Sequence, residues 1–223
     1  IKSHFTIARK SLESKKHVFV EKPLTKTVGE AEKLIDIAKR NKLCLFVGHV
    51  FLYNEIFQKI KKIHKNELIK HANFEWKKLG TFDEDIFENL LSHDLSLNLE
   101  LFGMPKKIQL NNKYSLLTPI DRFSLELFFS KTRRSEITID RTSHYKKKTV
   151  MITTRKNYYI WDNDELLKFD KKTETYKKIF QSKNMPLYLE CKEFIRIISA
   201  KNYSVDSAIL AKKISSLILK IPK

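Results

Sequence analysis

Glycine is scarce in this chain, with only four residues in 223, at Gly29, Gly48, Gly80 and Gly103. A phosphate-binding G-x-G-x-x-G loop needs three closely spaced glycines, so the sequence as given contains none. Cysteine is equally rare. Cys44 and Cys191 show neither C-x-x-C nor Cys/His spacing, which excludes a disulfide framework and a zinc site and predicts no metal ligands.

Long apolar runs are also absent. No segment approaches the roughly 20 apolar residues that a membrane span needs, and the first residues do not have the pattern of a signal peptide. We therefore expect no membrane partner and a reducing, cytoplasmic location.

Positive charge is abundant, with a formal net charge of +18 at pH 7. The lysines are spread over every predicted element instead of being gathered on one helix or groove, as a nucleic-acid interface would require. We expect no specific nucleic-acid partner, and at most weak binding that falls steeply with salt.

The first fifty residues have the pattern of two βα units. Residues 5–13 have helical spacing, and residues 17–20 form an apolar strand that ends at Glu21-Lys22-Pro23. A capping-box pair precedes an apolar helical stripe at 31–38, and a second apolar strand follows at 43–47. This order predicts a parallel βαβ crossover, with Glu21-Lys22-Pro23 and Gly48-His49 at one carboxyl edge, where open α/β sheets bind ligands.

The pattern changes after Tyr53. A short helix, an alternating stretch and a helix over 89–102 precede short alternating segments from 107 to about 180, which predict an antiparallel meander, and two helices close the chain. The predicted fold class is α/β plus α+β: the C-terminal part of a Rossmann-type domain (1–50), then an open, mostly antiparallel sheet domain with helices on one face (51–223).

Four motifs resemble those of one family. They are His4-Phe5-Thr6-Ile7-Ala8, the run from Leu12 to Glu21-Lys22-Pro23, Val47-Gly48-His49, and Ser92-His93-Asp94-Leu95-Ser96 with its Leu101-Phe102-Gly103 ending. Together they resemble the Gfo/Idh/MocA family of NAD(P)-dependent oxidoreductases. The string from Gly48 to Asn54 is most similar to members that act on nucleotide-linked or cell-surface sugars.

The resemblance implies NAD or NADP as cofactor, a sugar, sugar nucleotide or polyol as substrate, and homo-oligomers formed through the open sheet. Family members begin with a strand, a Gly-rich loop and an acidic residue for the ribose. Ile1 corresponds to a point after the fourth strand of a typical member. We therefore expect either a fragment or a truncated gene.

The resemblance assigns Lys22 and His93 as the catalytic proton-handling residues. A lysine withdrawn from water loses preference for its charged form, so it can act as an acid or base. Glu21, Lys22, Pro23 and His4 would contact the cofactor, with a cis bond before Pro23. For Glu21, a plain turn acid is the alternative.

The substrate side is less clearly defined. His49, Tyr53, Asn54, Asn89 and Asp94 are the predicted substrate-binding residues, although His49 could equally be structural. Relatives usually carry aspartate where Asn89 stands, and asparagine can orient a ligand but cannot take a proton. The alternative to an enzyme is a non-catalytic interaction or oligomerisation module derived from this family.

Overall fold

The computed structural model describes residues 3–222, which form two compact units. The first unit comprises the chain up to Tyr53 together with Met185–Lys220, and the second comprises Asn54–Asn184 with the last residues of the chain.

In the first unit, helix α1 (His4–Glu13), strand β1 (Val18–Glu21), helix α2 (Val28–Arg40) and strand β2 (Leu45–Gly48) follow one another as predicted. The strands pair in parallel, which brings Glu21 opposite Gly48. Thr27 and Glu30 form the predicted capping box at the start of α2. The βαβ prediction is therefore confirmed.

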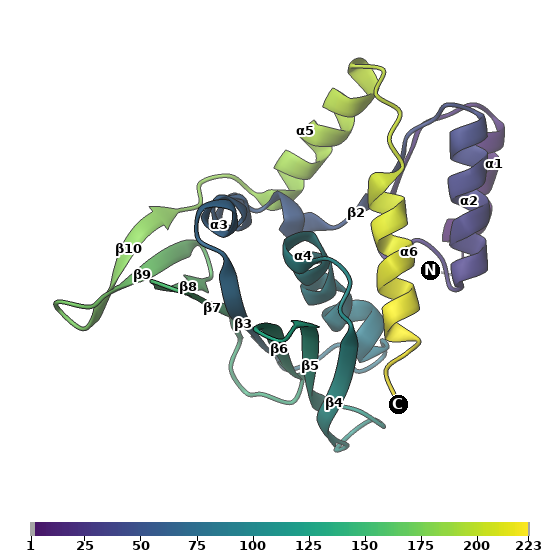
Figure 1. Cartoon of the computed structure of the whole chain (residues 1–223). Helices are drawn as coiled ribbons and strands as arrows, with labels where there is room; N and C mark the ends of the chain where they lie inside the picture. Colours follow the sequence, from purple (N-terminus) through teal and green to yellow (C-terminus); the bar gives the residue numbers. More distant parts are fainter. Residues whose placement is uncertain (1–2, 223) are drawn as a thin grey trace. The chain divides into compact units, whose positions relative to one another are not determined.

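Two helices from the end of the chain complete this unit (Figure 1): α5 (Pro186–Ser199) and α6 (Asp206–Ile218). Buried Ala208 and Ala211 of α6 lie in the same apolar cluster as Leu34 of α2 and Leu45 of β2. The sequence-based division placed both helices after residue 50, in the second domain. Sequence order alone could not show that the chain returns to cover the opening strands.

The second unit begins with α3 (Glu55–Asn66), β3 (Ile69–Lys77), a π-helical turn η2 (Phe87–Leu91) and α4 (Ser92–Phe102). The strands that follow are β4 (Lys107–Tyr114), β5 (Arg122–Ser130), β6 (Arg133–Asp140), β7 (Lys147–Thr154), β8 (Tyr158–Asp162), β9 (Glu165–Asp170) and β10 (Thr175–Gln181). The open, mostly antiparallel sheet is confirmed.

The strand order is β10-β9-β8-β7-β3-β6-β5-β4, so the prediction of an uninterrupted meander was wrong. Strand β3 lies between β6 and β7, parallel to the first and antiparallel to the second. An alternating pattern indicates where each strand lies in the sequence. It does not indicate that an earlier strand, β3, will lie between two later ones, β6 and β7.

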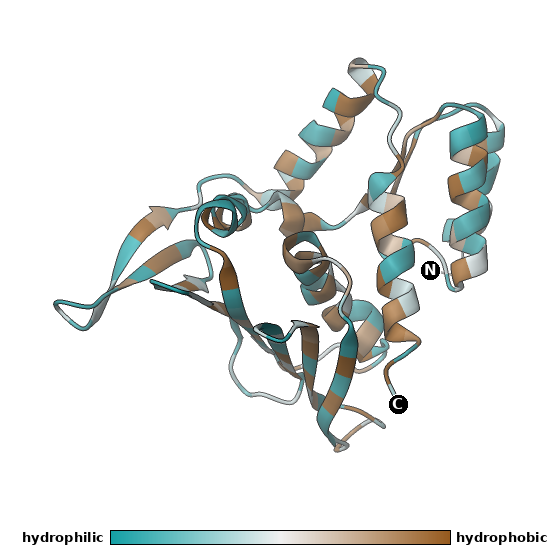
Figure 2. Cartoon of the chain, viewed as in Figure 1, coloured by the Kyte–Doolittle hydropathy of each residue, from teal (hydrophilic) through white to brown (hydrophobic). Residues whose placement is uncertain are grey.

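Apolar and polar residues alternate along many of the strands of this sheet, as the bands in Figure 2 show. Phe74 of β3, Leu125 of β5, Ile137 of β6 and Ile152 of β7 are all at most 1% exposed. Since side chains alternate along a strand, this register fixes which residues share the covered face and which share the opposite face.

A buried ion pair joins two loops of the second unit. Arg141 Nε donates to Asp121 Oδ1 over 3.1 Å, and both side chains are at most 4% exposed. The guanidinium also donates to the carbonyls of Thr81, Glu84 and Ile120. Arg141 therefore fastens the loop that leads into η2 and α4 to the β4–β5 loop.

Asp121 completes this arrangement from the other side. Its carboxylate accepts hydrogen bonds from the backbone N–H groups of Leu116, Leu117 and Thr118, at 2.6–2.9 Å, and from the Thr118 hydroxyl. Burial alone would raise the pKa of Asp121, but these hydrogen bonds hold it well below its usual range.

Candidate functional site

The turn after β1 brings together four of the residues predicted to contact the cofactor. The peptide bond between Lys22 and Pro23 is cis, as the resemblance implies. His4, at the start of α1, donates from Nδ1 to the Pro23 carbonyl over 2.8 Å. Glu21 and Lys22 follow directly at the carboxyl end of β1. The turn is thus anchored to the first helix at the sheet edge where ligands bind.

Gly48 lets the Glu21 carboxylate lie against the neighbouring strand. A Cβ atom at this position would stand 3.1 Å from Glu21 Oε2 and 3.2 Å from a ring carbon of Phe19. Real Cβ contacts are rarely so short, so a larger residue here would displace the Glu21 side chain. The glycine that the sequence places at the end of β2 therefore has a packing role.

His49 lies at the same edge and is 3% exposed. Burial, followed by the charge of Lys22, lowers the pKa of His49 to about 4, so its imidazole is neutral at pH 7. A hydrogen bond with the backbone of Ser207 opposes this shift. His49 is therefore a buried, neutral ring beside Lys22 at this sheet edge.

Glu190 of α5 is a member of this cluster that the sequence analysis did not assign. Its side chain is fully buried, and its carboxyl group lies against the backbone of His49. Burial, followed by the charge of Glu21, raises the pKa of Glu190 to about 7. The sequence contained no indication beyond an acidic residue on the apolar side of an amphipathic helix.

We expect Glu190→Gln to remove a pH dependence of stability. Unfolded Glu190 has its usual pKa of 4.5, whereas the folded group holds its proton up to about pH 7. The wild-type free energy of unfolding should therefore fall as the pH rises from about 5 to 8, by on the order of 3 kcal/mol. The variant should lose this slope and be the more stable protein at pH 8, as measured by chemical denaturation.

Glu193→Gln is the matched control for this prediction. Glu193 lies one turn further along α5 and is paired with Arg196 over 2.7 Å, which lowers its pKa. This control should keep the wild-type fall in stability between about pH 5 and 8. An unchanged slope in Glu190→Gln would show that Glu190 is ionised in the folded protein.

Tyr53 and Asn54 have structural contacts in this fold. The Tyr53 ring packs against Phe46, with 5.9 Å between the ring centroids. Asn54 belongs to the second unit, where it caps α3 by accepting the Ile56 N–H at Oδ1 over 2.8 Å. Substrate binding by these two residues stays a prediction.

His93 lies at the start of α4, directly after the π-helical turn η2. Asp85 caps this turn by accepting the N–H groups of Phe87 and Glu88 at Oδ1, at 2.9 and 3.0 Å. Asn89 lies within the turn, and its carbonyl accepts a hydrogen bond from the Ser92 hydroxyl. Such turns, in which the helix holds an additional residue, occur frequently at functional sites.

Two side chains of the second unit, Trp76 and Lys148, lie beside His93 and its neighbour Asp94. The His93 ring lies 5.6 Å from the Trp76 ring, centroid to centroid. Lys148 Nζ lies 3.8 Å from the centroid of the Trp76 ring and 4.0 Å from Asp94 Oδ1. Asp94 is 1% exposed, and burial raises its pKa to about 6 despite the nearby Lys148 charge. The cluster combines an acid/base residue, a cation and a carboxyl group.

The sequence analysis missed Lys148 because it lies in a run of three lysines, 146–148, which has the pattern of a solvated turn. Only the pairing of β7 with β3 places it beside Trp76. Trp76 packs against charged and titratable groups, Lys148 and His93.

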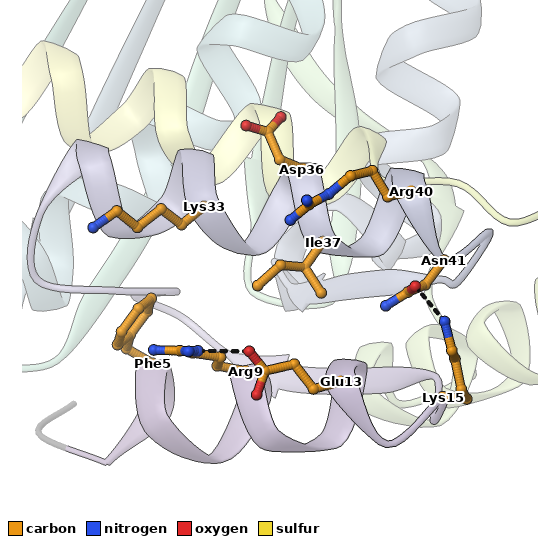
Figure 3. A pocket seen from close by; sticks show the side chains of 9 residues that line it. All are labelled: Phe5, Arg9, Glu13, Lys15, Lys33, Asp36, Ile37, Arg40 and Asn41. Carbon is orange, nitrogen blue, oxygen red and sulfur yellow. Dashed lines mark hydrogen bonds and ion pairs between the residues drawn. The ribbon is translucent and has the colours of Figure 1, made fainter.

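A groove of about 690 Å³ lies between α1 and α2 (Figure 3). Four of its polar side chains pair, Arg9 with Glu13 over 2.8 Å and Lys15 with Asn41, and Lys33, Asp36 and Arg40 also line it. In the described part of the chain, no helix is long and apolar enough to cross a membrane. Nor do residues 3–222 bring together three His, Cys, Asp or Glu side chains that could hold a metal ion.

Residues 2–49 match the family described as "Oxidoreductase family, NAD-binding Rossmann fold", GFO_IDH_MocA. Two curated relatives illustrate the range of similarity. UDP-N-acetylglucosamine 3-dehydrogenase from Acidithiobacillus ferrooxidans is 31% identical over 113 residues, 45% of this chain and 33% of the relative. The scyllo-inositol 2-dehydrogenase (NADP(+)) IolW from Bacillus subtilis is 28% identical over 145 residues, 57% of this chain and 40% of the relative.

Solved structures extend the similarity of fold over nearly the whole chain. The A. ferrooxidans enzyme GnnA superimposes with a TM-score of 0.89 at 20% identity, covering 98% of this chain and 74% of that one. Biliverdin reductase from Synechocystis, solved with biliverdin and NADP+, gives 0.79 at 16% identity, covering 98% and 75%. The sequence matches span a third to two fifths of the two curated relatives.

Proposed function

Because the chain belongs to the Gfo/Idh/MocA family of oxidoreductases, we propose that it is the substrate-handling part of an NAD(P)-dependent dehydrogenase. The substrate class is a sugar, sugar nucleotide or related polyol. One observation carries the proposal: the Glu21-Lys22-Pro23 turn is folded at the carboxyl edge of a parallel sheet, anchored by His4 and packed beside buried His49.

A nicotinamide fits the chemistry of this edge. His49 places a neutral, buried imidazole at this edge, and Lys22 supplies a positive charge beside it. The four glycines of the chain form no Gly-rich loop, so its residues would hold the nicotinamide end and not the pyrophosphate. When bound, the cofactor accepts or supplies the hydride.

Side chains of this chain would transfer the proton to and from the substrate hydroxyl group. Oxidising a secondary alcohol requires a base near its hydroxyl group, and the reverse reaction requires an acid. Half-buried Lys22 and His93 are the two groups that the family resemblance assigns to this step. Because Gly48 has no Cβ atom that would displace the Glu21 carboxylate, Glu21 would orient the turn that carries Lys22.

The proposal is tested by following the absorbance of reduced nicotinamide. We expect the full-length protein to reduce NAD+ or NADP+ when it is given UDP-N-acetylglucosamine or scyllo-inositol, the substrates named for the two curated relatives. Saturation of the initial rate with one of them would identify the substrate class. No reduction with either cofactor and a wider panel of sugars would refute the enzyme proposal.

Aromatic side chains on the outer face of the sheet support a second candidate, a non-catalytic interaction module. Its surface would be the outer face of the sheet, where Tyr158, Phe169 and Tyr176 form a row with centroid spacings of 6.2 and 5.2 Å. The same row supports the proposal of a homo-oligomer. NADPH and NADH binding, measured by the fluorescence of the nicotinamide, separates the candidates, since only the enzyme should bind either one.

A further inference from the structure

Lys148 occupies an unusual position for a lysine, at the end of the covered face of the sheet. It lies on β7 directly opposite Trp76 of β3. The same face continues with Phe74 and Val150, which are 1% and 3% exposed. A lysine on this face keeps its ammonium group at the border of an apolar core, where electrostatic interactions are stronger than in water.

Two side chains fix this ammonium group in space. The Trp76 ring lies 3.8 Å from Nζ, within the range of a strong cation–π interaction. Asp94 Oδ1 lies 4.0 Å away, at the edge of ion-pair distance. The carboxyl group of Asp94 is buried and neither oxygen has a hydrogen-bond partner in the part of the chain described. Asp94 is therefore placed to hold Lys148 and not to meet solvent.

The opposite face of the same strands shows the ordinary arrangement. Glu75 binds Lys77 and Lys147, each over 2.6 Å, and the Lys147 side chain is 44% exposed. These two lysines share one carboxylate at hydrogen-bond distance on this face. Lys148, at 17% side-chain exposure and with a buried Nζ, lies beside the ring that packs on His93.

We propose that Lys148 is a substrate-binding residue, and that it recognises a negatively charged group, a carboxylate or a phosphate, carried by the sugar. Trp76 and Asp94 are its positioning residues. This inference rests on the proposed function for the role of His93, beside which the charge is held. An ammonium group has three donors and no acceptor, so an anionic oxygen is the ligand group that suits it best.

The chain supplies its own reporter for this test. It contains two tryptophans, and Trp161 is buried with its indole N–H bonded to the Asn163 carbonyl. In a Trp161→Phe background, the fluorescence of Trp76 alone reports binding next to Lys148. The probes are D-glucuronate, D-glucose 1-phosphate and uncharged D-glucose, titrated without cofactor into the full-length protein.

We expect an anionic probe to bind at least about tenfold more tightly than D-glucose, the effect of one charge-assisted hydrogen bond. A preference for glucuronate assigns a carboxylate, and a preference for glucose 1-phosphate assigns a phosphate. Lys148→Met should reduce the affinity for the preferred anion to that for D-glucose, whereas Lys148→Arg should keep part of the preference. Lys147→Met, on the solvated face, is the control and should bind like the parent protein.

Equal affinity for all three probes would overturn the inference, as would a fluorescence that no anion changes or a preference that survives in Lys148→Met. If Lys148→Met does not fold, Lys148→Gln takes its place, and an anion preference that survives in it overturns the inference. The readout needs neither nicotinamide nor turnover. A protein that shows the anion preference but reduces no cofactor would refute the proposed function and leave the anion site standing.

Discussion

Replacing Lys22 with alanine is expected to lower kcat of the full-length protein by about 10²-fold or more, the range of a general acid/base contribution. The half-buried ammonium group lies at the end of β1, where it also lowers the pKa of buried His49. The affinity for the cofactor should change little, because the substitution removes only the atoms beyond Cβ of one side chain. Steady-state kinetics and direct titration with NADPH or NADH measure the two quantities separately.

Lys22→Arg distinguishes proton transfer from charge alone. Arginine keeps the positive charge but does not give up its proton in a protein, so this variant should be nearly as inactive as Lys22→Ala. Lys26→Ala, an exposed lysine four residues later, should retain the parent kcat. Recovery of activity in Lys22→Arg would mean that Lys22 acts only through its charge, and an unchanged kcat in Lys22→Ala would remove it from the mechanism.

Replacing Arg141 with leucine is expected to cost about 3–5 kcal/mol of folding free energy, because it leaves the buried Asp121 carboxylate without its ion-pair partner. It also leaves the carbonyls of Thr81 and Glu84 without their donor in the loop that leads into η2. Chemical denaturation, monitored by the fluorescence of Trp76 and Trp161 in the two strands beside β7, measures the loss.

The double variant Arg141→Leu/Asp121→Leu separates a lost attraction from an uncompensated buried charge. It should be less destabilised than the sum of the two single variants, since no unpaired ion remains. Arg122→Leu is the matched control: Arg122 is 53% exposed and 4.0 Å from Asp140, so we expect a change within about 0.5 kcal/mol. Additive single and double values would show that Arg141 and Asp121 are not coupled.

The sequence predicted the local elements well because local physics decides them. The capping box at Thr27 and Glu30, the helix stop at Gly103 and the apolar strand before Glu21 all depend on neighbours a few residues away. The insertion of β3 between β6 and β7 and the return of α5 and α6 to the first unit depend on contacts between segments 60 to 160 residues apart. No periodicity encodes these contacts.

The same distinction between local and distant contacts applies to the residues of the candidate site. The Glu21-Lys22-Pro23 turn and His93 could be predicted because each lies in a short motif that is readable in one stretch of chain. Glu190 and Lys148 could not be predicted, because only their surroundings in the fold distinguish them. Glu190 is buried beside a sheet edge that is distant in the sequence. Lys148 lies opposite Trp76 only because β7 pairs with β3. In isolation, an acidic residue on a helix and a lysine in a basic run are ordinary.

The placement of β3 has a consequence for the order of events during synthesis. The strand ends at Lys77, but its partners β6 and β7 are complete only at Asp140 and Thr154. At about 5–20 residues per second, both edges of β3 stay unpaired for on the order of 3–15 s after they are made. During this interval Ile69, Phe74 and Trp76 present an apolar strand to other nascent chains. Within the second unit, β3 is thus an apolar strand that is complete well before either of its pairing partners, and co-translational aggregation would be favoured there.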